Sequence, residues 1–174
     1  MFKKLFLNCT LVFTLSCAFV GAAIKFDNII AFGDSLTDVG NVAGLTQSGV
    51  SPRINGYYQQ THFSDNILWI EILANYLGLG QRTPGRGHST TLPAQPKGNT
   101  WAWGGSEAAF GNVQPPGVAE PIPNLLKEID QYLEKNPPSK KTLYTIWSGA
   151  DNLLIGGKFG PKAAKKAVKA VEKA

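Results

Sequence analysis

The features of this sequence that most limit its fold are three short apolar runs, each of which stops at a glycine turn. The first covers residues 24–32 and ends at Gly33, and similar runs begin near Thr100 and cover residues 142–147. A continuous run of β-forming residues that is bounded by glycine is typical of a strand buried on both faces of a parallel sheet. The sequence therefore predicts three strands of one sheet.

Helical patterns separate these runs. One begins with Ser64 as the expected N-cap and stops at Gly78, a second covers residues 124–136 and ends before Pro137, and a third opens at Pro161. The residues expected to face inward are Ile67, Ile70, Leu73, Ala74 and Leu77 in the first helix, Leu125, Leu126, Ile129 and Leu133 in the second, and Ala164, Ala167, Val168 and Val171 in the third. Strands alternating with helices predict an α/β protein with right-handed connections.

Polar or glycine turns follow the three predicted strands. Ser35 follows the first strand, Gly105 the second and Asp151 the third. In an open parallel sheet the carboxyl ends of the strands lie on one rim, where ligands bind. We therefore expect these three turns to meet at a single site.

The first 23 residues have the pattern of a secretory signal peptide. Two lysines precede an apolar stretch from Leu5 to about Val20, and small residues follow up to Ala22 or Ala23. The apolar stretch is shorter than a membrane-spanning helix needs. We expect an exported protein that is cleaved near Ala22 or Ala23, with a lipoprotein anchored at Cys17 as a minor alternative.

The composition is that of a globular protein and not that of a disordered or fibrous one. The 43% of apolar residues and 17% of charged residues suit one globular domain, here residues 24–174. Removing the leader, which holds two lysines and no acid, lowers the formal net charge from +5 to +3. The lysine-rich last helix is expected to be a solvated face, with no nucleic-acid partner and at most peripheral contact with a membrane. Both cysteines lie in the leader.

Four motifs in order resemble the GDSL family of ester hydrolases, also called SGNH hydrolases. They are "FGDSLTDVGN", "THFSDNILWIEILANYLGL", "NTWAWGGS" and "TLYTIWSGADNL". The sequence is most similar to the branch of secreted bacterial phospholipases, lysophospholipases, thermolabile haemolysins and glycerophospholipid:cholesterol acyltransferases. A lone Gly-Asp-Ser tripeptide is a weak signal, but four motifs in the right order are a strong one.

This resemblance implies a flavodoxin-like, three-layer α/β/α fold that uses no metal and no organic cofactor. Ser35 falls at the family's nucleophile, and Asp34 and Asn41 of the same motif are expected to support it. The resemblance implies that the serine attacks the ester carbonyl of a lipid, in keeping with the branch, and that the backbone N–H groups of Ser35 and Gly105 hold the oxyanion.

The third motif departs from the family, which ends this strand with Gly-x-Asn-Asp. This chain reads Gly149-Ala150-Asp151-Asn152, so Asp151 stands where the oxyanion asparagine is expected. An ionised carboxylate cannot donate a hydrogen bond to an oxyanion. Either Asp151 is protonated, or a shifted turn brings Asn152 into this role, or the donor is lost; the shifted turn is the favoured interpretation.

The family's Asp-x-x-His, which carries the catalytic base and its carboxylate, has no counterpart in the chain. The two histidines, His62 and His88, lack an aspartate three residues before them and are expected to have no catalytic role. We therefore expect the N-terminal part of an ester hydrolase, truncated or split from a C-terminal half. The competing hypothesis is an inactive remnant or a fragment that binds lipid or glycan.

Overall fold

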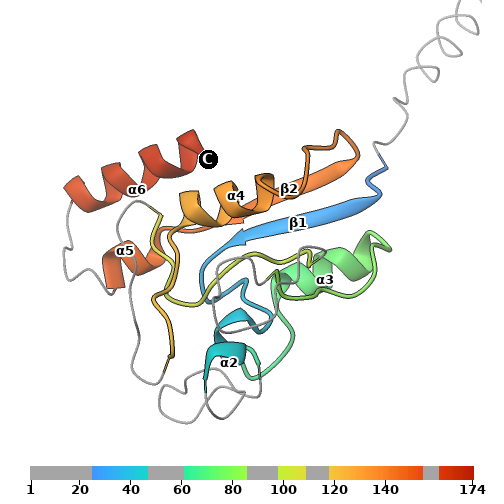
Figure 1. Ribbon diagram of the computed structural model, residues 1–174, viewed down its shortest axis with the longest axis horizontal. Coiled ribbons are helices and arrows are strands. Elements are labelled where there is room, and N and C mark those ends of the chain that lie inside the picture. The colour runs from blue at the N-terminus through green and yellow to red at the C-terminus, as the bar shows by residue number, and fades with distance from the viewer. Residues whose placement is uncertain (1–24, 47–60, 86–97, 109–117, 155–160) are drawn as a thin grey trace, which may run out of the picture.

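The described part of the chain forms a parallel sheet with helices on both of its faces (Figure 1). This computed structural model describes residues 25–46, 61–85, 98–108, 118–154 and 161–174, without the side chains of residues 161–163. The leader, His88 and Phe110 lie outside these residues. The elements are β1 (Asn28–Gly33), α2 (Asn41–Leu45), α3 (Trp69–Tyr76), α4 (Leu125–Leu133), β2 (Thr142–Trp147), α5 (Ala150–Leu154) and α6 (Pro161–Lys173).

The strands β1 and β2 pair in parallel along their whole length, from Asn28 opposite Thr142 to Gly33 opposite Trp147. The segment that starts at Asn99 lies along the other edge of β1. The backbone N–H of Ala31 donates to the carbonyl of Asn99 at 3.0 Å, and the N–H of Trp101 donates to the carbonyl of Ala31 at 2.7 Å. β1 therefore lies between β2 and this segment, but the segment forms only isolated bridges and not the third strand that the sequence predicts, so the described sheet has two strands.

Alternate residues of β1 enter two different apolar clusters, one on each face of the sheet. Ile30 and Phe32 pack with residues of α4 and α6, including Leu125 and Ala167. Ile29 and Ala31 pack with α3, including Ile70. Helices from different parts of the chain thus cover the two faces of the same strand.

The expected α/β class agrees with the helices and the parallel sheet that the structure describes, and the predicted bounds of the strand at residues 142–147 are confirmed. The full three-layer fold of the family, with its further strands, stays a prediction. The expected N-cap at Ser64 is wrong, because α3 begins at Trp69 with Leu68 as its N-cap. The hydroxyl of Ser64 instead accepts the Asn66 backbone N–H at 3.1 Å.

The inward stripes were predicted only in part. Leu133 is 45% exposed and Val168 is 56% exposed, whereas Glu128 and Tyr132 are buried in α4. Residues 125, 128 and 132 lie on one side of a helix, so the buried stripe of α4 is turned relative to the apolar pattern. The physical reason is a polar contact, since Glu128 accepts a backbone hydrogen bond from the end of β1.

The two tryptophans of the motif "NTWAWGGS", Trp101 and Trp103, belong to the core. Trp101 and Trp103 are both fully buried, and the indole N–H of Trp101 donates to the carbonyl of Gly98 at 2.9 Å. Trp101 also packs edge-on against Tyr132, with ring centroids 5.5 Å apart. Among the described helices, none has the length and apolar character that crossing a membrane requires.

Candidate functional site

The turn that carries Ser35 begins where β1 meets the end of β2. Gly33 has a φ of 141°, and a Cβ atom at this position would collide with the carbonyl oxygen of Trp147. Only glycine suits such a backbone and such a close approach. The next residue, Asp34, donates its backbone N–H to the same carbonyl at 3.1 Å. Ser35 then sits in the turn, partly exposed, directly beyond the paired strands.

Asp34 is buried beneath this turn. Its Oδ1 accepts the backbone N–H of Leu36 at 3.1 Å, which orders the backbone around Ser35. Its Oδ2 has no hydrogen-bond partner among the described residues. Burial raises the pKa of Asp34 to about 6, against the lowering effect of the backbone N–H groups of Leu36 and Asp34.

The second turn, at Gly104 and Gly105, is held by side chains from the first motif. The N–H of Gly104 donates to Oδ2 of Asp38 at 2.9 Å. The side-chain amide of Asn41 donates to the carbonyls of Thr100 at 3.0 Å and Ala102 at 2.8 Å. Residues near the first turn therefore fix the position of the second.

Asp38 also organises the start of α2. It accepts the backbone N–H groups of Gly40 at 2.8 Å, Asn41 at 2.6 Å and Val42 at 3.1 Å. Its burial raises the pKa of the carboxyl, while these N–H groups and that of Gly104 lower it. One fully buried carboxyl thus joins α2 to the glycine turn.

Glu128 of α4 contacts the first turn from the face of the sheet that α4 covers. Its Oε2 accepts the backbone N–H of Gly33 at 2.9 Å. Glu128 is fully buried, and burial raises its pKa well above the usual range, with the charge of Asp38 adding to this effect. The last residue of β1 is therefore held by Trp147 on one side and by Glu128 on the other.

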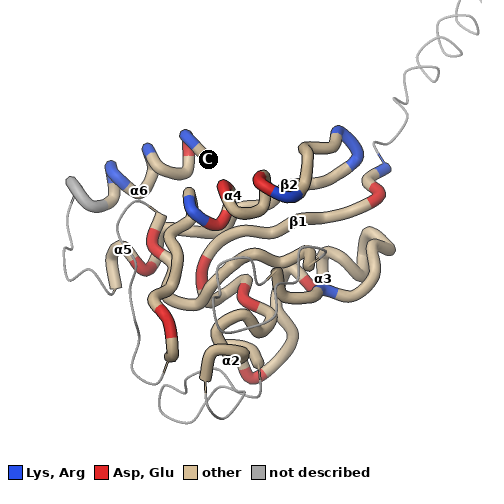
Figure 2. Tube along the Cα trace, viewed as in Figure 1, with Lys and Arg blue, Asp and Glu red and all other residues tan. Residues whose placement is uncertain are grey.

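The third turn brings Asp151, in the first turn of α5, to the other two. Burial, the charge of Asp34 and the charge of Glu107 raise the pKa of Asp151 to about 7. A hydrogen bond from the backbone N–H of Gly105 works in the opposite direction. The three turns predicted to meet do lie together, since Asp151 interacts with residues of both other turns. Acidic residues follow β1 and lie in α5 (red in Figure 2).

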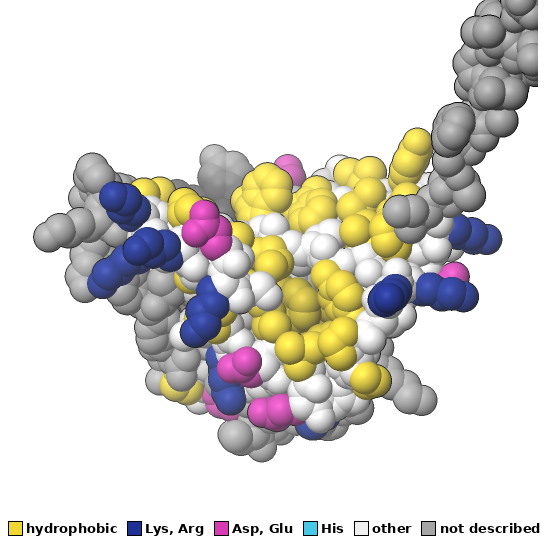
Figure 3. Space-filling view, turned by 90° about the horizontal axis from the view of Figure 1, so that it is seen from above, with side chains coloured by type: hydrophobic (Ala, Val, Ile, Leu, Met, Phe, Trp, Pro, Cys, Tyr) yellow, Lys and Arg dark blue, Asp and Glu magenta, His cyan; other side chains and the backbone are white. Residues whose placement is uncertain are grey.

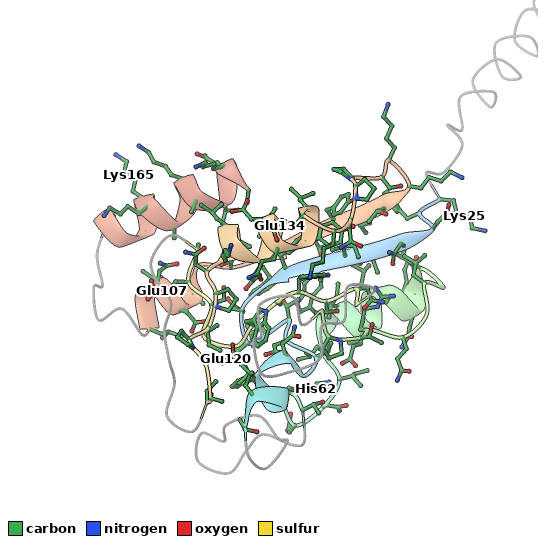
Figure 4. All side chains as sticks on the ribbon, viewed as in Figure 1. Lys25, His62, Glu107, Glu120, Glu134 and Lys165 are labelled. Carbon is green, nitrogen blue, oxygen red and sulfur yellow. The ribbon has the colours of Figure 1, made fainter. Side chains whose placement is uncertain are left out.

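Asn152 uses both ends of its side chain in other contacts. Its Oδ1 accepts the backbone N–H of Ala108 at 2.8 Å, and its Nδ2 donates to Oε2 of Glu107 at 3.4 Å. Glu107 lies beside α5 in Figure 4. A shift of the turn that gives Asn152 the role of oxyanion donor has to break these contacts.

His62 contacts Glu71 of α3. Its Nε2 lies 3.7 Å from Oε1 of Glu71, and Oε2 of the same carboxylate accepts the N–H of Leu68 at 2.7 Å. The neighbouring Thr61 packs against Gly40 at the start of α2, where Figure 4 places His62. Within the described ranges, no group of three or more His, Cys, Asp or Glu side chains could hold a metal ion.

Sequence reasoning missed two residues that hold the site together, Asp38 and Glu128. Asp38 carries a signal that a search for caps detects, because aspartate three residues before a helical segment often accepts its first N–H groups. Glu128 has a weaker signal, namely an acid at helical spacing between the apolar residues Leu125 and Tyr132. A buried acid at such a position requires a donor, but the sequence does not say which one.

The fold and the three turns describe an α/β protein with a serine at the carboxyl end of β1, and the comparisons with known proteins point the same way. The chain is 28% identical, over 149 residues, to a phosphatidylcholine-sterol acyltransferase from Aeromonas hydrophila, a match that covers 86% of this chain and 39% of that protein. It is 26% identical, over 130 residues, to a thermolabile hemolysin from Vibrio parahaemolyticus, covering 75% of this chain and 26% of that protein. No family model matches the chain.

These two matches confirm the predicted resemblance to the branch that contains such acyltransferases and haemolysins. The chain spans only part of each relative's length, about two fifths of the first and about a quarter of the second.

Proposed function

We propose that this chain is the nucleophile-bearing part of a lipolytic ester hydrolase of the phospholipase or lysophospholipase kind, with Ser35 as the nucleophile. The observation that carries the proposal is the meeting of three turns around Ser35, which follow β1, the segment at 99–103 and β2. The names of the two relatives, an acyltransferase acting on phosphatidylcholine and sterol and a haemolysin, support a lipid ester as the substrate.

In this proposal the hydroxyl oxygen of Ser35 attacks the ester carbonyl and forms a tetrahedral intermediate. The hydroxyl proton passes to a general base, which later gives it to the departing alcohol, and water then releases the acyl group from the serine. Backbone N–H groups of Ser35 and Gly105 hold the oxyanion, and the N–H of Gly105 exchanges its hydrogen bond with Asp151 for one with the oxyanion. A preorganised donor of this kind is worth about 3 kcal/mol of barrier.

We further propose that the general base, a histidine, comes from a polypeptide segment outside this chain. Among the described residues, His62 has no contact with the turn that carries Ser35, and the greater length of both relatives supports an additional segment. The outer edge of β2 is where such a segment would pair, because no described strand lies beside it. Figure 3 shows apolar side chains gathered on this side of the molecule between two groups of lysines.

Export is part of the same proposal. The leader pattern of residues 1–23 supports cleavage near Ala22 or Ala23, after which the protein would meet lipid outside the cytoplasm.

The test is hydrolysis of p-nitrophenyl butyrate and of lysophosphatidylcholine by the full chain, alone and after fusion to any coding sequence found in another frame directly downstream. Ser35→Ala should abolish turnover. Ser139→Ala, at an exposed serine before β2, is the matched control and should leave turnover unchanged. Hydrolysis that survives Ser35→Ala would refute the assignment of the nucleophile.

A catalytically inactive remnant, or a fragment that binds lipid or glycan, is the second candidate. The acid at position 151, in place of the expected amide donor, is the observation that favours it. This candidate predicts no turnover with or without a downstream segment, together with binding of lysophosphatidylcholine that Ser35→Ala does not change.

A further inference from the structure

The carboxyl groups of Asp34 and Asp151 are both buried and interact electrostatically, and no cation among the described residues lowers the pKa of Asp151. Asp34 is 1% exposed and Asp151 is 7% exposed. They are brought together by the junction of the strands, because the N–H of Asp34 donates to the carbonyl of Trp147, four residues before Asp151. The charge of Asp34 acts directly on Asp151.

Each of these carboxyl groups leaves one oxygen unused. Oδ2 of Asp34 and Oδ2 of Asp151 are both buried and have no hydrogen-bond partner among the described residues. Two ionised carboxylates in such a place would repel each other and would each lose their hydration, so at least one of them must take up a proton. A neutral carboxylic acid has an O–H group that an unused oxygen can carry.

The other charged groups around Asp151 do not remove this requirement. Glu107, which precedes Ala108 and contacts Asn152, adds a further negative charge. On α6, which packs against α5, the charged residues with described side chains are Lys165, Lys166, Lys169, Glu172 and Lys173, and all of these are exposed. The groups that act on Asp151 are thus two acids and the N–H of Gly105.

We propose that Asp34 and Asp151 share one proton at neutral pH, and that the neutral carboxyl of Asp151 is the side-chain donor to the oxyanion in the place of an amide. The second half of this proposal rests on the proposed function. A carboxylic acid that is kept neutral by its surroundings can serve as an oxyanion donor. Asn152 does not need to move, and its contacts with Ala108 and Glu107 can stay intact.

The arrangement carries a consequence for the pH dependence of the site. The pKa of Asp151, about 7, and that of Asp34, about 6, place the loss of the shared proton near neutrality. Above this pH both carboxyl groups are ionised and the donor is lost. An amide at position 151 would donate at every pH.

The test follows the backbone amide of Gly105 by NMR in the full, ¹³C,¹⁵N-labelled chain from acid to alkaline pH, together with the side-chain carboxyl carbon of Asp151. Both signals should titrate with a midpoint near 7. Asp34→Asn should lower this midpoint by about 1 unit or more, because it removes the neighbouring charge. Asp151→Asn should abolish the titration of Gly105.

Asp130→Asn, at an exposed carboxylate of α4, is the matched control and should leave the midpoint unchanged. A midpoint near pH 4, or a midpoint that Asp34→Asn does not move, would overturn the proposal. The carboxyl carbon of Asp151 is observed in the unsubstituted protein, so the test holds even if a variant fails to fold.

The outcome separates this proposal from the proposed function. A shared proton without any Ser35-dependent hydrolysis would leave the acid pair standing and remove the hydrolase. Hydrolysis that depends on Ser35, with Asp151 ionised at pH 7, would do the reverse. Where hydrolysis occurs, kcat should fall above about pH 7 in the wild type but not in Asp151→Asn.

Discussion

The two strands β1 and β2 have the same length and pair residue by residue, yet their surroundings are opposite. Five of the six residues of β1 are buried, whereas no residue of β2 is fully buried. Phe32 and its register partner Ile146 are both large and apolar, but Phe32 is 3% exposed and Ile146 is 36% exposed. The difference arises because β1 has neighbours on both edges while β2 has a described neighbour on one.

An apolar run in the sequence indicates that a strand is suited to burial, but it does not show whether other elements cover that strand in the folded chain. β2 carries Tyr144, Ile146 and Trp147 as a central strand would. Exposed apolar strand edges promote unwanted pairing, so a sequence of this kind is expected to have a partner. Substitutions on the two strands can test this directly.

The largest expected effect of a single substitution on stability is that of truncating Phe32, and the comparison is with truncation of its register partner Ile146. Phe32→Ala should lower the free energy of unfolding by about 3–5 kcal/mol, since it opens a cavity beside Tyr132, whose ring packs edge-on against Phe32 at 5.5 Å. Ile146→Ala should cost about 1 kcal/mol, because its side chain already meets water. Urea denaturation of the full chain measures both values. Equal losses would show that β2 is as well packed as β1.

The second effect tests the junction at the carboxyl ends of the two strands, where Gly33 is paired with Trp147. Gly33→Ala should destabilise the protein by about 2–3 kcal/mol, because the new Cβ atom would collide with the carbonyl of Trp147 and force the ends of β1 and β2 apart. Gly80→Ala, with a φ of 70° and no atom within 4 Å of the new Cβ, should cost only about 1 kcal/mol. A similar loss in both variants would mean that the backbone angle alone matters.

The third effect is a pH dependence at the same junction. The raised pKa values of Asp34 and Asp151, about 6 and about 7 against 3.8 for an ordinary aspartate, mean that the folded protein holds more protons than the unfolded chain between about pH 4 and pH 7. The free energy of unfolding should therefore fall, on the order of 5 kcal/mol, as the pH rises through this range.

Asp151→Asn isolates the contribution of one of these two groups. Its unfolding free energy should depend less steeply on pH between 4 and 7 than that of the wild type, since the amide does not titrate. Parallel urea curves at several pH values give both slopes. An unchanged slope would mean that Asp151 is ionised in the folded protein across this range.

The sequence predicted most of what local pattern controls. The strand at 142–147, the glycine after α3 and the proline that opens α6 follow from β-propensity, from the φ of 67° at Gly78 and from the missing N–H of proline. The meeting of the three turns was also predictable, because parallel strands end on one rim. The strand, the glycine and the proline depend on residues close together in the chain, whereas the meeting of the turns follows from the parallel pairing of the strands.

The rest depended on contacts between distant residues. The bond from Gly33 to Glu128 joins residues 95 positions apart, and it turns the buried stripe of α4 away from Leu133. The contacts of the Asn152 side chain with Ala108 and Glu107 also join distant parts of the chain, and the role of Asn152 as an oxyanion donor stays a prediction. None of these contacts leaves a periodic signal in the sequence.

The smallest expected effect on stability concerns the open edge itself. Ile146→Lys should change the free energy of unfolding by no more than about 1 kcal/mol, because the lysine can extend along the strand edge into water. It should nevertheless reduce association of the full chain at high protein concentration, since charged edge residues oppose strand pairing. Tyr76→Lys adds the same charge at an exposed site on α3 and is the control. Sedimentation velocity at several concentrations gives the mass of each variant. If both lysines reduce association equally, net charge is the cause. If only Ile146→Lys does, the chain associates through the edge of β2.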